Sequence, residues 1–109
     1  MHALAKDEVL KLPRGDVQLA SINWLSDMSL AFTLLLSDTR QARLVCTFAH
    51  HVRIGLEFEE RTGGYPLSWD ITYSELPDGG WHVLMDFAHT GSVEFDCAEL
   101  RYEHVTIAA

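Results

Sequence analysis

The chain has 109 residues, of which 48% are apolar, and this combination fits one domain over residues 1–109 and excludes wholesale disorder. Its net charge of −8 is unevenly placed: residues 1–53 carry five acidic and six basic side chains, whereas residues 54–109 carry eleven acidic and two basic ones. Surfaces that bind nucleic acid or an anionic membrane are normally basic, so we expect neither partner.

The first forty residues predict a helix or arm followed by strands. Residues 1–12 alternate charged and apolar side chains and fit either a short helix or a loose arm. They lack a continuous apolar stretch, so no signal peptide is expected, and no later run reaches the length of a membrane helix. Residues 17–24 fit both helical and strand spacing. We favour a strand, because a turn at 26–27 would join it as a hairpin to the apolar run 28–36.

Alternation of apolar and polar residues predicts half-buried strands from residue 28 onward. Its clearest case is 67–74, whose odd-numbered residues are all apolar. Residues 77–80, Pro-Asp-Gly-Gly, have the composition of a hairpin loop in which glycine supplies a positive φ. Residues 81–87 and 92–97 alternate in the same way on either side of a short turn.

This spacing gives about eight short strands joined by short turns. We predict a mainly β fold, an antiparallel sandwich or partly open barrel, with a short N-terminal helix if residues 1–12 are not a loose arm. The core is expected to hold the inward-facing side chains of the strands. These are Leu30, Phe32, Leu34, Phe48, Ile54, Leu56, Trp69, Ile71, Tyr73, Val83, Met85, Val93 and Phe95.

The residues with reactive or metal-binding side chains form no familiar motif. Because no export signal is visible, Cys46 and Cys97 are expected to be buried, reduced thiols in a cytoplasmic protein. The six histidines lack the usual metal-ligand spacings and are expected to be exposed. His50 and His51 are adjacent, so they would point to opposite faces of a strand, or both outward in a turn. Neither a nucleophile elbow nor a phosphate-binding glycine loop is present, so no catalytic, cofactor or metal site is predicted.

Six carboxylates occupy polar-face positions of the strands in the second half, and a meander of these strands would bring them to one face. Glu94 and Asp96 would lie roughly 6–7 Å apart along one strand, a spacing that could hold a cation or serve acid–base chemistry. An exposed face of this kind serves either solubility or the docking of a basic protein. The residues of this predicted acidic face are Glu57, Glu59, Asp70, Asp86, Glu94 and Asp96.

The stretches PLSWDI (66–71), DGGWHV (78–83) and GSVEFDCAEL (91–100) resemble small acidic bacterial β-proteins, some of which are grouped with immunity proteins of polymorphic toxin systems. The resemblance covers residues 42–104 and implies a non-enzymatic binding protein, without transferring any functional residue. The leading hypothesis is therefore a non-catalytic protein-binding domain, such as an immunity-type inhibitor that docks on a basic protein. The alternatives are a small-molecule-binding β-barrel that uses Trp24, Trp69 or Trp81 and, third, an enzyme.

Overall fold

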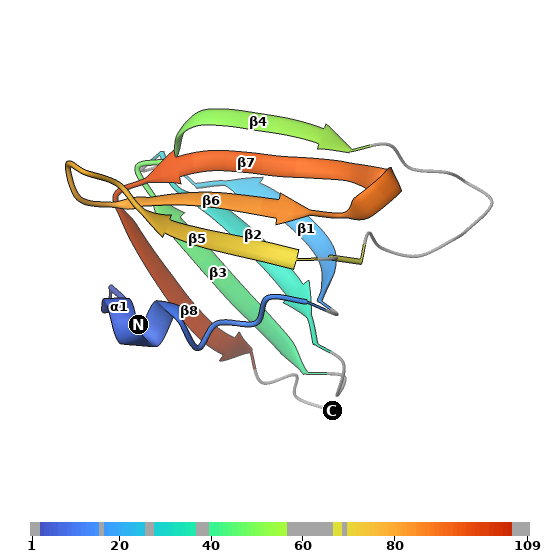
Figure 1. Cartoon of the computed structure of the whole chain (residues 1–109). Coiled ribbons are helices and arrows are strands. Elements are labelled where there is room, and N and C mark those ends of the chain that lie inside the picture. The colour runs from blue at the N-terminus through green and yellow to red at the C-terminus, as the bar shows by residue number, and fades with distance from the viewer. Residues whose placement is uncertain are drawn as a thin grey trace.

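Two antiparallel β-sheets face each other across the hydrophobic core, and their strands cross at an angle (Figure 1). The computed structural model describes residues 3–15, 17–25, 28–36, 40–56, 67–68 and 70–105. Within these ranges, the first sheet contains, in spatial order, β1 (Gln18–Trp24), β2 (Leu30–Leu35), β3 (Gln41–Thr47) and β8 (Glu99–Val105). The second sheet contains, in spatial order, β4 (His50–Leu56), β7 (Gly91–Cys97), β6 (Trp81–Asp86) and β5 (Asp70–Glu75). The predicted mainly β fold of about eight strands is confirmed, and its architecture is the sandwich.

A bent ribbon of two long segments joins the sheets. β3 pairs with β8 in the first sheet, and their continuations β4 and β7 pair in the second. At the bend, the Ala98 N–H donates to the Thr47 carbonyl over 2.8 Å, so backbone pairing continues through the corner. The bend places Phe48 and His51 in the left-handed region, with φ of 52° and 53°. Backbone strain therefore accompanies the change of direction at residues 48–51.

The β5–β6–β7 meander has the hairpins that the sequence predicts. In the 77–80 loop, the Gly80 carbonyl accepts from the Leu76 N–H over 3.1 Å, and Gly79 and Gly80 have φ of 89° and 88°. The next connection is the short 3₁₀ helix η1 (Ala88–Thr90). β4 lies beside β7 rather than beside β5, which gives the second sheet the strand order of a Greek key.

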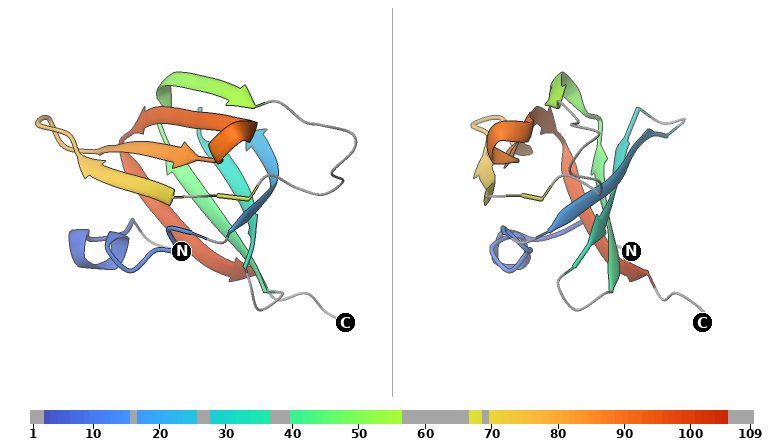
Figure 2. Two further views of the ribbon diagram at one scale, coloured as in Figure 1. Left: turned by 45° about the vertical axis from the view of Figure 1, so that its right-hand side comes forward. Right: turned by 90° about the vertical axis from the view of Figure 1, so that its right-hand side faces the viewer.

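The N-terminal segment is a packed part of the fold. Residues Lys6–Val9 form the single turn α1, and the side chains of Val9 and Leu12 are buried in the core. The segment closes the side of the sandwich between β5 and β8 (Figure 2), because Leu4 N–H donates to Leu100 O over 2.8 Å and the Tyr73 hydroxyl donates to Pro13 O over 3.4 Å. Of the two expectations for residues 1–12, the short helix is confirmed. Within the described ranges, no helix is long and apolar enough to span a membrane.

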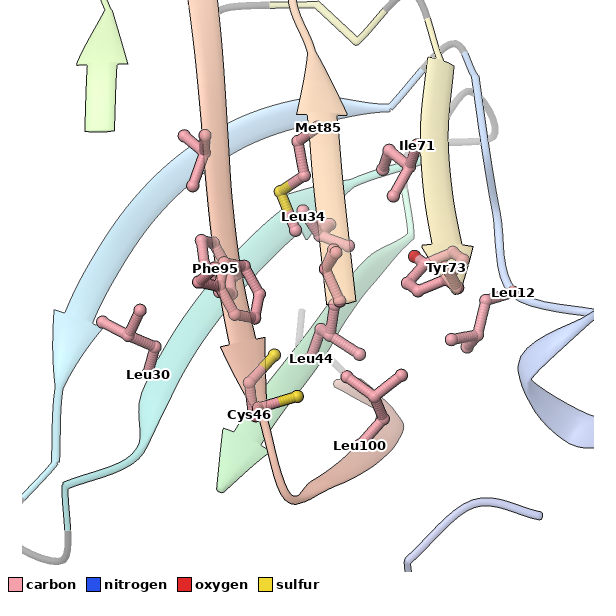
Figure 3. Close-up of a cluster of buried hydrophobic side chains, with 14 of the residues drawn as sticks. Leu12, Leu30, Leu34, Leu44, Cys46, Ile71, Tyr73, Met85, Phe95 and Leu100 are labelled. Atoms are coloured by element: carbon pink, nitrogen blue, oxygen red, sulfur yellow. The ribbon is translucent and has the colours of Figure 1, made fainter. Parts of the chain in front are cut away.

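Two aromatic rings fill the centre of the core. Phe32 of β2 and Phe95 of β7 stack with ring centroids 5.3 Å apart, and both are fully buried. Leucine, isoleucine and methionine side chains from both sheets surround them (Figure 3). The core prediction is confirmed at nine positions, and Leu56 is partly buried against the same cluster. Those nine are Leu30, Phe32, Leu34, Ile71, Tyr73, Val83, Met85, Val93 and Phe95.

Two of the core predictions, Phe48 and Ile54, are wrong. Phe48 is 64% exposed because it lies in the left-handed bend after β3, where strand alternation has ended. Ile54 is 48% exposed because β4 is an edge strand. The strand predicted over 67–74 begins only at Asp70: Leu67 is exposed, and Ser68 is buried because it forms backbone and side-chain hydrogen bonds with Val17. Trp69, the remaining core prediction, lies outside the described residues.

Both cysteines are free and buried, as expected. Burial raises the pKa of the Cys46 thiol well above its ordinary value, and the adjacent Cys97 thiol adds to the rise. Since both thiols are shielded from solvent by burial, we expect both to react with an aromatic disulfide reagent at least about tenfold more slowly in the native protein than in denaturant. Two thiols per chain should react after unfolding. Rapid native reaction, or no reactive thiol after unfolding, would contradict this prediction.

Candidate functional site

Four of the six carboxylates assigned to the predicted acidic face lie on strands of the second sheet. Asp70 and Asp86 lie directly opposite each other on β5 and β6, and Glu94 and Asp96 follow on β7. The residues between them along each strand are buried, so these four carboxylates lie on the face that points away from the first sheet, here called the outer face. Glu57 and Glu59, the other two members of the prediction, lie outside the described residues.

His82 of β6 lies between the two carboxylates of β7. Its Nδ1 donates to Asp96 Oδ1 over 2.6 Å, and its Nε2 donates to Glu94 Oε2 over 3.0 Å. The imidazolium form is the one that donates from both nitrogens. The hydrogen bond to Asp96 raises the pKa of His82, partial burial opposes the rise, and the hydrogen bond to Glu94 adds to it. Hydrogen bonds from His82 and then His51 lower the pKa of Asp96. His82 therefore compensates part of the negative charge on β7.

His50 and His51 project toward the same carboxylate from the bend. The β4–β7 register shifts between His50 and Arg53, so a bulge replaces the regular alternation there. His51 Nδ1 donates to Asp96 Oδ2 over 3.1 Å, and the His50 and His51 rings meet edge to face with centroids 4.9 Å apart. The expectation that both would be exposed is confirmed. The sequence did not predict that both would converge on Asp96.

Among the described residues, His50, His51 and Asp96 form a group that could hold a metal ion, since their ligand atoms lie within 4.8 Å of one another.

The contacts of His82 do not favour a role in acid–base catalysis. Ser74 lies directly opposite His82 on β5, in the position that a nucleophile would need. Both ring nitrogens of His82 already contact carboxylates, however, so the ring offers no free lone pair to take the serine proton.

The described tryptophans do not converge on one cavity. Trp24 is exposed at the end of β1 in the first sheet, whereas Trp81 is half-buried against the core at the start of β6 in the second. Trp69 lies outside the described residues. The stacked rings of Phe32 and Phe95 occupy the centre between the sheets, where a small ligand of the alternative hypothesis would need space.

Comparison of the chain with protein-family models, with curated protein sequences and with solved structures finds no match in any of the three. The resemblance of residues 42–104 to small acidic bacterial β-proteins therefore stays a prediction, and so does the function that it implies.

The contacts of His82 and Asp96 predict a pH-dependent contribution to stability. Because the pKa of His82 is raised in the folded protein, the contribution of His82 to stability is complete below its ordinary pKa of 6.5 and is lost as the pH rises through the raised pKa. The lowered pKa of Asp96 means that its contribution is complete above 3.8 and is lost as the pH falls through the lowered value. The contact should therefore stabilise the fold most between pH 3.8 and 6.5.

We accordingly expect His82→Gln to lower the free energy of unfolding by less than about 1 kcal/mol near pH 5.5, and by less still near pH 8.5. The loss is small because the His82 side chain is 36% exposed and water screens the charges. Urea unfolding at the two pH values, with a chelator present, measures the difference. The control is His104→Gln, which changes an exposed histidine on β8. An equal loss at both pH values would show that the charge on His82 does not contribute.

Proposed function

We propose that the chain is a non-catalytic protein-binding domain that docks a basic surface of a partner protein on its outer face. The observation that carries the proposal is the pairing of Asp70 with Asp86, two like charges directly opposite each other on neighbouring strands. Like charges in this position repel and weaken a free sheet. A cationic partner would relieve the repulsion and bind more tightly for that reason.

The charge on the outer face supports the β5–β6 end as the centre of contact. At the β4–β7 end, Glu94 contacts His82 and lies opposite Arg53, so part of its charge is compensated within the chain. At the other end, Asp86 Oδ1 accepts from the Ala88 N–H over 2.8 Å, which orients the carboxylate without adding a cation. Asp70 is exposed at the start of the edge strand β5. A basic side chain of a partner would therefore find its least compensated anions here.

An immunity-type inhibitor, the class that the resemblance implies, would use such a face by covering a basic surface of a toxin without any chemical step. The filled centre of the core and the occupied nitrogens of His82 are consistent with binding as the function. A small-molecule-binding domain is the second hypothesis, but the separated positions of Trp24 and Trp81 do not favour it.

The isolated domain gives the first test of the like-charge pair. Asp70→Asn removes one charge of the pair and should raise the free energy of unfolding by about 0.2–1 kcal/mol. Asp78→Asn is the matched control, because it removes the same charge from the exposed 77–80 loop. Urea unfolding at low ionic strength measures both variants. A loss of stability in Asp70→Asn, or the same gain in the control, would contradict the proposed repulsion.

The partner gives the second test. Wild-type, Asp70→Asn and Asp78→Asn proteins would be used as matched baits in extracts of the source cells, and the association rate of a captured protein would be measured by interferometry at several salt concentrations. We expect the wild-type rate to fall steeply with ionic strength and to be lower for Asp70→Asn than for Asp78→Asn. A partner whose rate does not depend on salt, or that binds the sheet β1-β2-β3-β8, would overturn the proposal.

A further inference from the structure

We propose that His50, His51 and Asp96 form a binding site for one divalent transition-metal ion, with Zn²⁺ as the expected occupant. This site goes beyond protein docking and does not depend on it, since its residues gather at the bend between β3 and β4 rather than at the β5–β6 end of the outer face. Four observations carry the inference: the spacing of the donor atoms, the second contacts of the ligands, the backbone that presents them and their chemical type.

The donor atoms are close to the spacing that a zinc ion needs. Zinc binds imidazole nitrogen and carboxylate oxygen at about 2.0–2.2 Å, so two ligands of one tetrahedral ion lie roughly 3.3–3.5 Å apart. The three donor atoms here lie within 4.8 Å of one another, and His51 Nδ1 and Asp96 Oδ2 are 3.1 Å apart. The side chain of His51 is 79% exposed, so a rotation of its ring can complete the geometry without disturbing the core.

Two of the ligands are already oriented by second contacts. His50 Nδ1 lies 3.0 Å from the Phe48 carbonyl oxygen, which can only accept, so Nδ1 carries the proton and Nε2 keeps a free lone pair. Asp96 Oδ1 accepts the short hydrogen bond from His82, which leaves Oδ2 directed at His51. Metal-binding histidines and carboxylates in proteins are usually held by contacts of this kind.

The backbone brings the two histidines to one side. Consecutive residues of a regular strand point to opposite faces of the sheet. Two adjacent histidines therefore could not normally both reach one ion that is also bound by a residue on the neighbouring strand. The bulge between His50 and Arg53 removes this alternation, and His51 has a φ of 53°, which is unusual for a residue with a Cβ. Unusual backbone of this kind is common where a side chain is directed to a binding site.

The ligand set selects the class of ion. Two imidazoles and one carboxylate suit Zn²⁺ and its neighbours, whereas Ca²⁺ and Mg²⁺ prefer sites composed of oxygen ligands. Three protein ligands leave a fourth position open to water. An ion entering between His51 and Asp96 would replace their hydrogen bond, and the ring proton of His51 would move from Nδ1 to Nε2. His82 would act as a positioning residue, because it contacts Asp96 and not the proposed ion.

Calorimetric titration of the full chain with ZnCl₂ in a non-chelating buffer tests the site. We expect one ion per chain and no comparable binding of MgCl₂ or CaCl₂. His51→Ala and Asp96→Asn should each weaken the affinity at least about 100-fold, and His82→Gln should weaken it about 10–100-fold. His104→Ala is the matched control, because it removes an exposed histidine from the first sheet and should leave the affinity unchanged.

His50→Ala is the second variant of a proposed ligand, since the side chain of His50 is exposed and contributes little to folding, and circular dichroism can confirm that the variant is folded. It should lose affinity together with His51→Ala. The proposal is overturned if the wild-type chain shows no saturable Zn²⁺ binding. It is equally overturned if folded His50→Ala and His51→Ala bind as tightly as His104→Ala.

Discussion

Phe95→Ala is expected to lower the free energy of unfolding by about 3–5 kcal/mol. Phe95 is fully buried and stacks on Phe32 of the opposite sheet, so the truncation removes apolar contacts and leaves a cavity between the two layers. The cavity cannot collapse easily, because each layer is held by hydrogen bonds to neighbouring strands on both sides: β7 by β4 and β6, and β2 by β1 and β3. A loss of this size is a large fraction of the stability of a small domain.

Chemical denaturation of the wild type and of two phenylalanine variants measures the effect. The control is Phe48→Ala, which removes the same ring from an exposed position in the bend and should change the free energy of unfolding by less than about 0.5 kcal/mol. A loss under about 1 kcal/mol for Phe95→Ala would mean that its inward position does not contribute as the packing indicates. Equal losses of unfolding free energy for Phe95→Ala and Phe48→Ala would lead to the same conclusion.

These two phenylalanines also show how far alternation predicts the fold. Phe95 lies in the middle of a strand with neighbours on both sides, so the period of two assigned it correctly to the interior. Phe48 continues the period of β3, but the chain leaves the strand there through a left-handed residue. Alternation describes the inside of a strand and does not locate its end. The strand predicted from residue 67 shows the same limit, because β5 begins only at Asp70 and Leu67 is exposed.

The candidate site combines a contact across a local hairpin, which the sequence could predict, with contacts between distant strands, which it could not. The 88–91 turn was expected, and a hairpin closed by it places His82 opposite Asp96, so this contact could have been derived from the sequence. The approach of His50 and His51 could not, because β4 reaches β7 across more than thirty residues of chain and a bulge then changes the direction of the side chains. Non-local pairing and bulges leave no periodic signal in one sequence.

Gly91 is the position where we expect the other large effect. It begins β7 with φ 123° and ψ −153°, a conformation that only glycine adopts readily. It also lies opposite Leu56, and a Cβ added to Gly91 would overlap the carbonyl oxygen of Gly55 and approach the backbone of Leu56. Backbone atoms in a paired strand cannot move aside as the end of a side chain can. β4 would have to separate from β7, or Gly91 would have to change its backbone angles and end the strand.

We therefore expect Gly91→Ala to lower the free energy of unfolding by at least about 3 kcal/mol, combining backbone strain with the loss of part of the β4–β7 pairing. Gly55→Ala is the matched control: Gly55 lies on β4 opposite Ser92, and a Cβ there meets no atom within 4 Å. The control should be neutral, or more stable by up to about 1 kcal/mol, because alanine restricts the unfolded chain. Denaturation of both variants, with hydrogen exchange of the β4 amides, separates strain from loss of pairing. Equal stability of the two variants would show that β4 and β7 are not held as closely at Gly91 as the structure places them. The bend that presents His50 and His51 would then lack the rigid support that their convergence on Asp96 requires.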